Sequence, residues 1–166
     1  MVFDGAYHFI PQDAIYSSEQ AFRDASLNEQ RLRDLLKTIR AQKSLIILDT
    51  CHAGAVKLAG VPSSLGLRGD LSLETSITKL NRATGRAVLM ASSDQAMALE
   101  GKDQHGFFTY ELLQGLQGAA DTDNDGDIST LELAGFVDKE VPKLTHDRQF
   151  PVHELNGNAF PIGAVR

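Results

Sequence analysis

Two short runs of uninterrupted aliphatic residues constrain the fold of this chain more than any other feature. They are Leu45-Ile46-Ile47-Leu48 and Ala87-Val88-Leu89-Met90. A strand apolar at every position, rather than at alternate ones, is typical of a parallel sheet covered by helices on both faces. The two runs therefore predict neighbouring buried strands in an α/β fold.

Helical patterns separate and follow these strands. A Ser26…Glu29 pair fits a capping box and precedes an apolar stripe with helical spacing, so we expect a helix over about 27–41. Further helices are expected over about 72–82, 107–116 and 130–143, a short strand over 7–10, and extended segments near Phe150 and Phe160. No domain boundary is visible, so residues 1–166 are interpreted as one domain with a mostly parallel sheet flanked by helices.

The composition excludes several classes of protein. The 166 residues include 16 basic and 22 acidic side chains, for a net charge of −6, and five of the acids lie within one twelve-residue window. The rest of the chain is nearly neutral and has no basic patch, which argues against nucleic acid as a partner. No run is apolar and long enough to span a membrane, and no signal peptide is visible. With one cysteine, a reducing cytoplasm is the expected location.

The single cysteine, Cys51, lies just after the first aliphatic strand. Ligands bind at the carboxyl edge of open α/β sheets, and the small residues Ala53 and Gly54 allow a tight turn that aims backbone N–H groups at the thiol. A small buried residue at a strand end is the alternative. The polar neighbours Asp49 and His52 favour a reactive thiol, which would need a nearby base.

The stretch Leu48-Asp49-Thr50-Cys51-His52-Ala53-Gly54 resembles the nucleophile motif of metacaspases and bacterial caspase-like peptidases. Further resemblance continues in order along the chain, over residues 4–13, 89–100, 105–113 and 149–151. The resemblance implies a caspase-like sandwich, a cysteine endopeptidase acting on protein or peptide substrates, and a Cys–His pair with Cys51 as the nucleophile.

The expected histidine base is missing from its usual place. In caspase-type enzymes it lies about 50 residues before the cysteine, which from Cys51 falls at the start of this chain. We therefore expect a domain incomplete at its N-terminus, lacking its first strands, with its base upstream of Met1. His52 is adjacent to Cys51 and badly placed as its base, while His8 and His105 are expected to be structural and His146 and His153 solvated. By itself, the 166-residue chain is expected to have little or no peptidase activity.

Substrate preference is predicted from Asp49, two residues before Cys51. In metacaspases, which the motif resembles, an acidic residue at the position of Asp49 binds a basic side chain of the substrate. A carboxylate can pair with arginine through two hydrogen bonds. Asp94, after the second strand, is predicted to line the same cleft. Cleavage after Arg or Lys is the expectation. The alternative for Asp49 is a carboxylate that accepts backbone N–H groups and shapes the turn.

The acidic window at 121–132 fits the loop of an EF-hand at every position. The pattern offers side-chain oxygens at loop positions 1, 3 and 5, a glycine at 6, a backbone carbonyl at 7 and a glutamate at 12, between two predicted helices. The predicted Ca²⁺ ligands are Asp121, Asp123, Asp125, Asp127 and Glu132. The alternative is an acidic turn that caps the following helix. The peptide-bond chemistry itself needs no cofactor.

Two other interpretations of the whole chain stay open. It could be a catalytically inactive caspase-like module or scaffold that binds calcium, which the missing histidine favours. It could also be an EF-hand calcium sensor, although a single loop and the wider resemblance argue against this. The physiological substrate, the oligomeric state and activation by self-cleavage cannot be read from the sequence.

Overall fold

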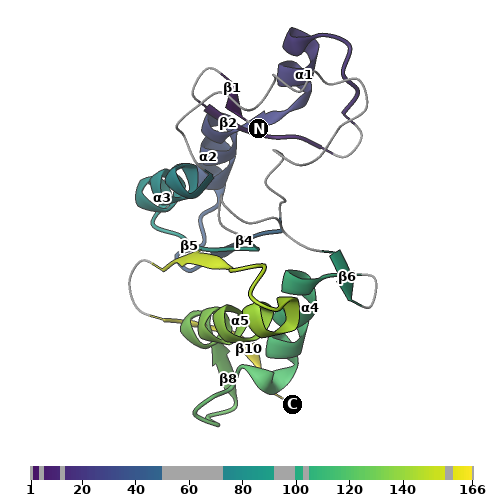
Figure 1. Ribbon diagram of the computed structural model, residues 1–166. Helices are drawn as coiled ribbons and strands as arrows, with labels where there is room; N and C mark the ends of the chain where they lie inside the picture. The colour runs from purple at the N-terminus through teal and green to yellow at the C-terminus, as the bar shows by residue number, and fades with distance from the viewer. Residues whose placement is uncertain are drawn as a thin grey trace.

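A central sheet separates two layers of helices and small sheets. The computed structural model describes residues 2–3, 6–11, 14–49, 73–91, 100–102, 105–155 and 159–165. In Figure 1 the sheet crosses the middle of the molecule, with α1, α2 and α3 above it and α4, α5, β8 and β10 below. This arrangement confirms the predicted α/β class.

The central sheet contains β4 (Leu45–Leu48), β5 (Ala87–Met90) and β9 (Val152–Glu154), in that order. β4 and β5 are parallel and in register, whereas β9 is antiparallel to β5. Among the described residues the sheet is therefore mixed, with a single parallel pair. All four residues of β5 are buried, as predicted.

The prediction that β4 is covered on both faces is wrong for the described residues. Three of its residues are half-buried, and Ile47 is 41% exposed. The reason is its place in the sheet: β4 pairs only with β5 within the described part of the chain, so it forms an edge strand. The continuous aliphatic run thus predicted the strand correctly, but the strand is less buried than the run indicated.

The upper layer begins with a small antiparallel sheet, in the order β1 (Val2–Phe3), β2 (Ala6–Phe9) and β3 (Leu27–Asn28). α1 (Glu19–Ala25) lies between β2 and β3 and was not predicted. Its residue Phe22 is fully buried and contacts the rings of Phe3 and Tyr16 edge-on. A seven-residue helix is too short to show a clear period in the sequence, which explains the omission.

The predicted capping box at Ser26 is also wrong. α2 runs from Glu29 to Thr38, and its N-cap is Asn28, whose side chain accepts a hydrogen bond from the Arg31 backbone N–H at 2.8 Å. Ser26 instead ends α1: its hydroxyl donates to the Arg23 carbonyl at 2.6 Å. Both Ser and Asn are good caps, so the sequence alone did not separate the two positions.

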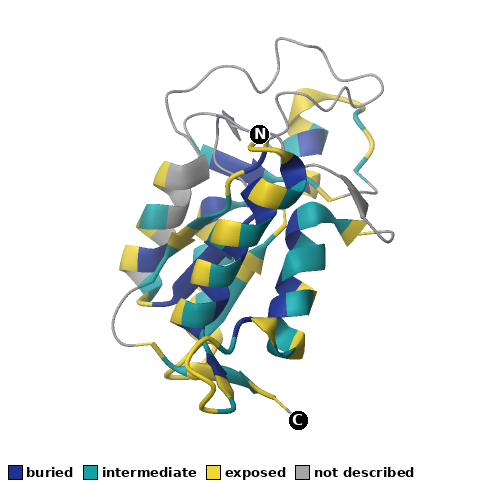
Figure 2. Ribbon diagram, turned by 60° about the horizontal axis from the view of Figure 1, so that its bottom comes forward, coloured by how far each residue is buried: buried dark blue, intermediate teal, exposed yellow. Residues whose placement is uncertain are grey.

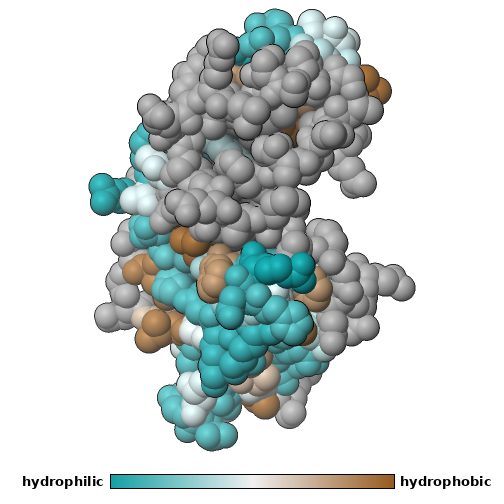
Figure 3. Space-filling view, in the orientation of Figure 1, coloured by the Kyte–Doolittle hydropathy of each residue, from teal (hydrophilic) through white to brown (hydrophobic). Residues whose placement is uncertain are grey.

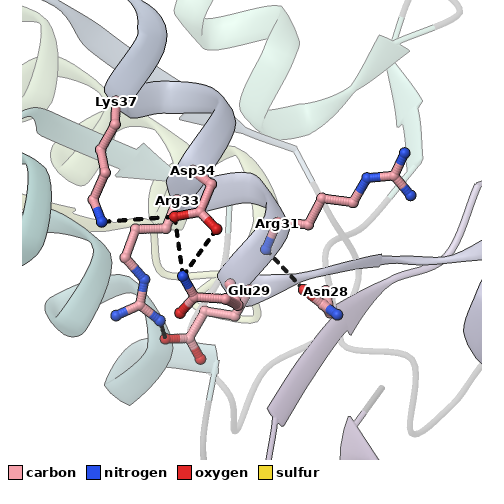
Figure 4. Close-up of polar contacts among 7 residues, drawn as sticks. Asn28, Glu29, Arg31, Arg33, Asp34 and Lys37 are labelled. Carbon is pink, nitrogen blue, oxygen red and sulfur yellow. Dashed lines mark hydrogen bonds and ion pairs between the residues drawn. The ribbon is translucent and has the colours of Figure 1, made fainter.

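Polar contacts run along the exposed side of α2 (Figure 4). Arg33 forms an ion pair with Glu29 at 2.9 Å, and Lys37 lies 3.6 Å from Asp34, each one helical turn apart. The Lys37–Asp34 pair is exposed and adds only about 0.3–0.5 kcal/mol to helix stability, whereas Glu29, the partner of Arg33, is buried. The anchoring of α2 therefore depends more on its apolar side, where Leu32 and Leu36 pack against buried residues of β2 and β5.

The end of α2 is fixed to the sheet by Arg86, the residue just before β5. The Arg86 guanidinium donates to the carbonyls of Leu36 and Ile39, at 2.9 and 2.8 Å, which are among the last carbonyls of the helix. The Leu36 carbonyl also accepts from the Ile39 backbone N–H at 3.1 Å, so the buried guanidinium adds a second, charged donor where the negative end of the helix dipole lies. α3 (Leu73–Thr84) packs beside α2, and its Asn81 donates to the carbonyls of Arg86 and Glu154.

The lower layer contains α4 (Phe107–Gln114), a π-helical turn η1 (Gly115–Ala119), β8 (Asp127–Ser129), α5 (Thr130–Thr145) and β10 (Pro161–Ala164). A short hairpin, β6 (Glu100–Lys102) with β7 (His105–Gly106), leads into α4. The largest core cluster joins this layer to the sheet and includes Leu89, Phe108, Ile128 and Val137. Figure 2 shows buried residues along the helix faces turned towards the sheet.

Candidate functional site

Asp49 immediately follows β4, at the carboxyl edge of the parallel pair. Its side chain is exposed, and its Oδ2 accepts a hydrogen bond from the Thr109 hydroxyl at 2.5 Å. Thr109 is the third residue of α4. A contact between residues sixty positions apart thus brings the start of α4 against the end of β4, where the sequence predicted a substrate pocket.

The start of α4 explains why a carboxylate is favourable at this position. Its N-cap is Gly106, which has no side chain to accept a hydrogen bond, and the first turn contains no acidic residue. The N-terminus of a helix carries a partial positive charge that attracts anions. Asp49 supplies a negative charge there from the neighbouring strand. The alternative, in which Asp49 accepts backbone N–H groups of the following turn, concerns residues after 49 that lie outside the described part of the chain.

The neighbouring strand β5 is anchored at the same edge. The Ala91 N–H donates to the Leu48 carbonyl at 3.0 Å, and the Ala91 carbonyl accepts from the Gln149 side chain at 2.8 Å. Gln149 is completely buried, in spite of its polar side chain. Sequence reasoning placed Gln149 only in a closing stretch that resembles a family, and it missed Thr109 as a partner of Asp49. Neither contact leaves a local signal in the sequence.

Cys51, His52 and Asp94 lie outside the described residues. The roles predicted for them depend on the sequence alone. The structure does describe the residues shortly before them, at the strand ends: Asp49 is two residues before Cys51, and Ala91 is three residues before Asp94. β4 and β5 are adjacent and parallel, so the chain leaves both strands at the same edge.

The other four histidines lie in the described residues. His8 is buried in β2, and its Nδ1 is 2.6 Å from the Ser26 hydroxyl, so it forms part of the core. His105 is exposed in β7, directly before the N-cap of α4, and His146 is the exposed C-cap of α5. His153 was expected to be solvated and is exposed, and its Nδ1 lies 3.0 Å from Asp138.

Asp138 and His153 form a half-buried pair between α5 and β9. Burial raises the pKa of the Asp138 carboxyl, and the nearby His153 opposes that rise. The pair connects α5 to the antiparallel edge of the sheet. Its partners come from a helix and a strand on the opposite side of β5 from Asp49, so we assign it a structural role.

The acidic loop lies between η1 and α5, with β8 as its last part. Asn124 and Gly126 adopt positive φ angles of 58° and 87°, which allow the chain to turn sharply. Carboxylate oxygens of Asp121, Asp123 and Glu132 all lie within 4.8 Å of one another. Figure 3 shows a hydrophilic surface at the lower end of the molecule, where this loop lies.

Three of the five predicted calcium ligands thus converge through their side chains. Asp125 is exposed, and its Oδ1 accepts from the Asp127 N–H at 2.8 Å. The side chain of Asp127 was not expected to converge, because loop position 7 offers its backbone carbonyl. Within the described residues, Oδ1 of Asp121 is buried without a hydrogen-bond partner. A buried carboxylate oxygen without a donor is costly unless a cation or water satisfies it.

Glu132 closes the loop. Its Oε2 accepts from the backbone N–H and hydroxyl of Ser129, at 2.9 and 2.8 Å, and its Oε1 accepts from the corresponding groups of Thr122, at 3.0 and 3.1 Å. These bonds, led by the Ser129 backbone N–H, lower the pKa of Glu132 from 4.5 to about 2. The same carboxylate completes a capping box at the start of α5, the alternative that we considered for this motif.

The fold and this edge geometry define an α/β protein whose parallel strands end beside an exposed acidic residue. Comparison with protein families gives a match to "Caspase domain" over residues 7–159. The chain therefore belongs to the caspase domain family, whose members are cysteine peptidases that act on proteins. Comparisons with curated proteins and with solved structures gave no match. Among the described residues, no helix has the length and apolar character needed to cross a membrane.

Proposed function

We propose that this protein is a metacaspase-type cysteine endopeptidase, with Cys51 as its nucleophile. Membership of the caspase domain family supports cysteine peptidase chemistry. The observation that carries the proposal is the position of Asp49: it is exposed at the carboxyl edge of β4, two residues before the chain's only cysteine. An oxidised thiol cannot act as a nucleophile, so we also propose a reducing, cytoplasmic location.

In the proposed reaction the Cys51 thiolate attacks the carbonyl carbon of the scissile peptide bond. The carbon–nitrogen bond breaks, and the leaving amine takes the proton that a base removed from the thiol. Water then adds to the thioester carbon, the carbon–sulfur bond breaks, the new carboxylate is released, and a proton from the water restores the thiol. Backbone N–H groups near the thiol stabilise the oxyanion formed in each step.

Asp49 is proposed to select substrates with Arg or Lys before the cleaved bond. Thr109 occupies one carboxylate oxygen, Oδ2, and a carboxylate has capacity for further donors. The bond from Thr109 fixes the carboxylate at the strand end without neutralising its charge. Asp94, which follows the end of β5 by four residues, is proposed as a second acidic residue lining the cleft.

Irreversible labelling tests both assignments, because the chain has a single cysteine. We expect a peptidyl chloromethyl ketone ending in arginine to alkylate Cys51 faster than a matched reagent ending in aspartate. In Asp49→Asn the rate with the arginine reagent should fall about tenfold or more, the effect of losing one charged hydrogen-bond partner. The aspartate reagent controls for general thiol reactivity. A preference for the aspartate reagent would refute the proposed specificity.

Labelling and turnover, measured together, separate the peptidase from the inactive alternative. Two of the described histidines, His8 and His153, are engaged by Ser26 and Asp138, and turnover needs a base for Cys51. We therefore expect little or no peptide hydrolysis by the 166-residue chain alone, even where Cys51 is labelled. Robust hydrolysis that is lost in Cys51→Ala would contradict this expectation. Absence of both labelling and hydrolysis would favour an inactive module.

We also propose that the loop at 121–132 binds Ca²⁺. The convergence of Asp121, Asp123 and Glu132 and the buried, unpartnered oxygen of Asp121 support this. Asp125 and the backbone carbonyl of Asp127 would supply further oxygen ligands, as hard cations require. Calorimetric titration of the full chain tests the proposal, with Asp121→Ala and Glu132→Gln as controls. Heat of binding should be seen for the unmodified chain and lost in both variants; no binding at millimolar Ca²⁺ would exclude the site.

A further inference from the structure

The last described strand of the chain, β10, lies against the acidic loop and pairs antiparallel with β8. Two backbone hydrogen bonds lie at the two ends of the pair. The Val165 N–H donates to the Gly126 carbonyl at 2.8 Å, and the Thr130 N–H donates to the Phe160 carbonyl at 2.9 Å. The chain from 160 to 165 therefore follows the loop from its glycine turn to the first residue of α5.

Close packing accompanies this pairing. Ile128 is fully buried, and an ideal Cβ placed on Gly163, which faces it, would lie 3.6 Å from the Ile128 Cδ1. At the other side of the loop, Val165 covers Gly118, the residue of η1 with a φ of +121°. A Cβ on Gly118 would lie 3.2 Å from Val165 Cγ1, so glycine allows the tail to approach closely. The chain from 160 to 165 thus contacts both the loop itself and the π-helical turn before it.

We propose that β10 is part of the calcium site, holding the loop in its binding conformation, so that Ca²⁺ binding and β10 docking strengthen each other. This inference rests on the Ca²⁺ site proposed above. Asp127, whose backbone carbonyl is the predicted ligand at loop position 7, lies opposite Ala164 in the β8–β10 register. The carbonyl of its neighbour Gly126 is held by Val165.

The coupling follows from the small size of both partners. β8 has three residues and β10 has four, and an isolated two-stranded pair of this length is marginally stable. Docking of β10 orders the backbone that must otherwise be ordered when the ion binds, which lowers the entropic cost of binding. By linkage, bound Ca²⁺ must raise the equilibrium constant for β10 docking by the same factor by which docked β10 raises the Ca²⁺ affinity.

Two substitutions of Val165 separate the contribution of its backbone hydrogen bond to Ca²⁺ affinity from the contribution of its side chain. Val165→Pro removes the N–H that the Gly126 carbonyl accepts, whereas Val165→Ala keeps that N–H and removes only part of a side chain that is 40% exposed. Val165 is not one of the predicted ligands. In calorimetric titrations of the full chain with CaCl₂, we expect Val165→Pro to raise the Kd about tenfold, and Val165→Ala to change it less than about threefold.

The reciprocal effect is measured on the unmodified chain with a metal-independent serine carboxypeptidase. Saturating Ca²⁺ should slow removal of the residues of β10 about tenfold, and Ca²⁺ should have no effect on removal in Glu132→Gln. Equal Ca²⁺ affinities for the unmodified chain, Val165→Pro and Val165→Ala would overturn the coupling while leaving the site intact. An unmodified chain that binds no Ca²⁺ at millimolar concentration would overturn both the site and the coupling.

Discussion

The acidic loop and the carboxyl edge of the sheet are built in different ways. The converging oxygens of the loop come from Asp121, Asp123 and Glu132, within one run of twelve residues. The edge is assembled from β4, the start of α4, the end of β5 and Gln149, which are up to a hundred positions apart in the chain. A contiguous motif specifies its own geometry, whereas a sheet-edge site exists only after the strands and helices have packed.

The two sites also differ in how they are attached to the core. The loop contributes the fully buried Ile128 to the largest hydrophobic cluster. Asp49 is exposed, and the hydrogen bond from Thr109 joins it to the lower layer. We therefore expect substitutions at the loop to affect stability and substitutions at the edge to affect substrate selection. The three predictions below test that separation, from the largest effect to the smallest.

Ile128→Ala should cost about 2–5 kcal/mol of unfolding free energy, because it leaves a cavity in a fully packed cluster. The matched control is Leu131→Ala, also in the loop but 59% exposed, which should change the free energy by no more than about 0.5 kcal/mol. Urea unfolding with a calcium chelator present measures both. Similar losses for the two variants would mean that the loop is not anchored through Ile128.

Glu132 should make stability depend on pH in the acid range. The pKa of its carboxyl is lowered to about 2 in the folded protein, from 4.5. Its bonds therefore stabilise the fold fully above about pH 4.5, and the stabilisation is lost as the pH falls towards 2. The free-energy difference between the unmodified chain and Glu132→Gln, measured by urea unfolding in chelator, should shrink over this interval. A difference that stays constant from pH 6 to 2 would contradict the assignment.

Thr109→Val should weaken the preference for the arginine reagent by a few-fold, because the hydrogen bond that positions the Asp49 carboxylate is lost. Thr109→Ser keeps a hydroxyl and should retain the preference. The ratio of labelling rates with the arginine and aspartate reagents is the measurement, and unfolding free energies of both variants should stay within about 1 kcal/mol of the unmodified chain. Equal ratios in both variants would show that Thr109 does not position the carboxylate.

The sequence predicted best where structure depends on local pattern. Buried strand β5, helix α5 and the loop before it were located from aliphatic content, helical spacing and ligand spacing. The short helix α1 was missed, and Ser26 was assigned to the wrong helix because Asn28, two residues later, is an equally good N-cap. The exposure of β4 and the pairing of β10 with β8 depend on which strands meet, which a local pattern does not record.

The candidate site, too, was predicted from the sequence only in part. Asp49 was identified from its spacing to Cys51, but its partner Thr109 and the buried anchor Gln149 required the folded chain. Membership of the caspase domain family agrees with the resemblance seen in the motif around Cys51. The specificity, the metacaspase subtype and the calcium site remain proposals with the tests given above.

The reactivity of Cys51 in the folded chain tests the central claim most directly. With one cysteine in the sequence, iodoacetamide incorporation reports on that thiol alone. If Cys51 is the nucleophile of a peptidase, its thiol is accessible to substrate, and the folded chain should be alkylated at a rate within about tenfold of the chain unfolded in urea at the same pH. Protection of the folded chain by a hundredfold or more would show a buried structural cysteine and contradict the proposed function.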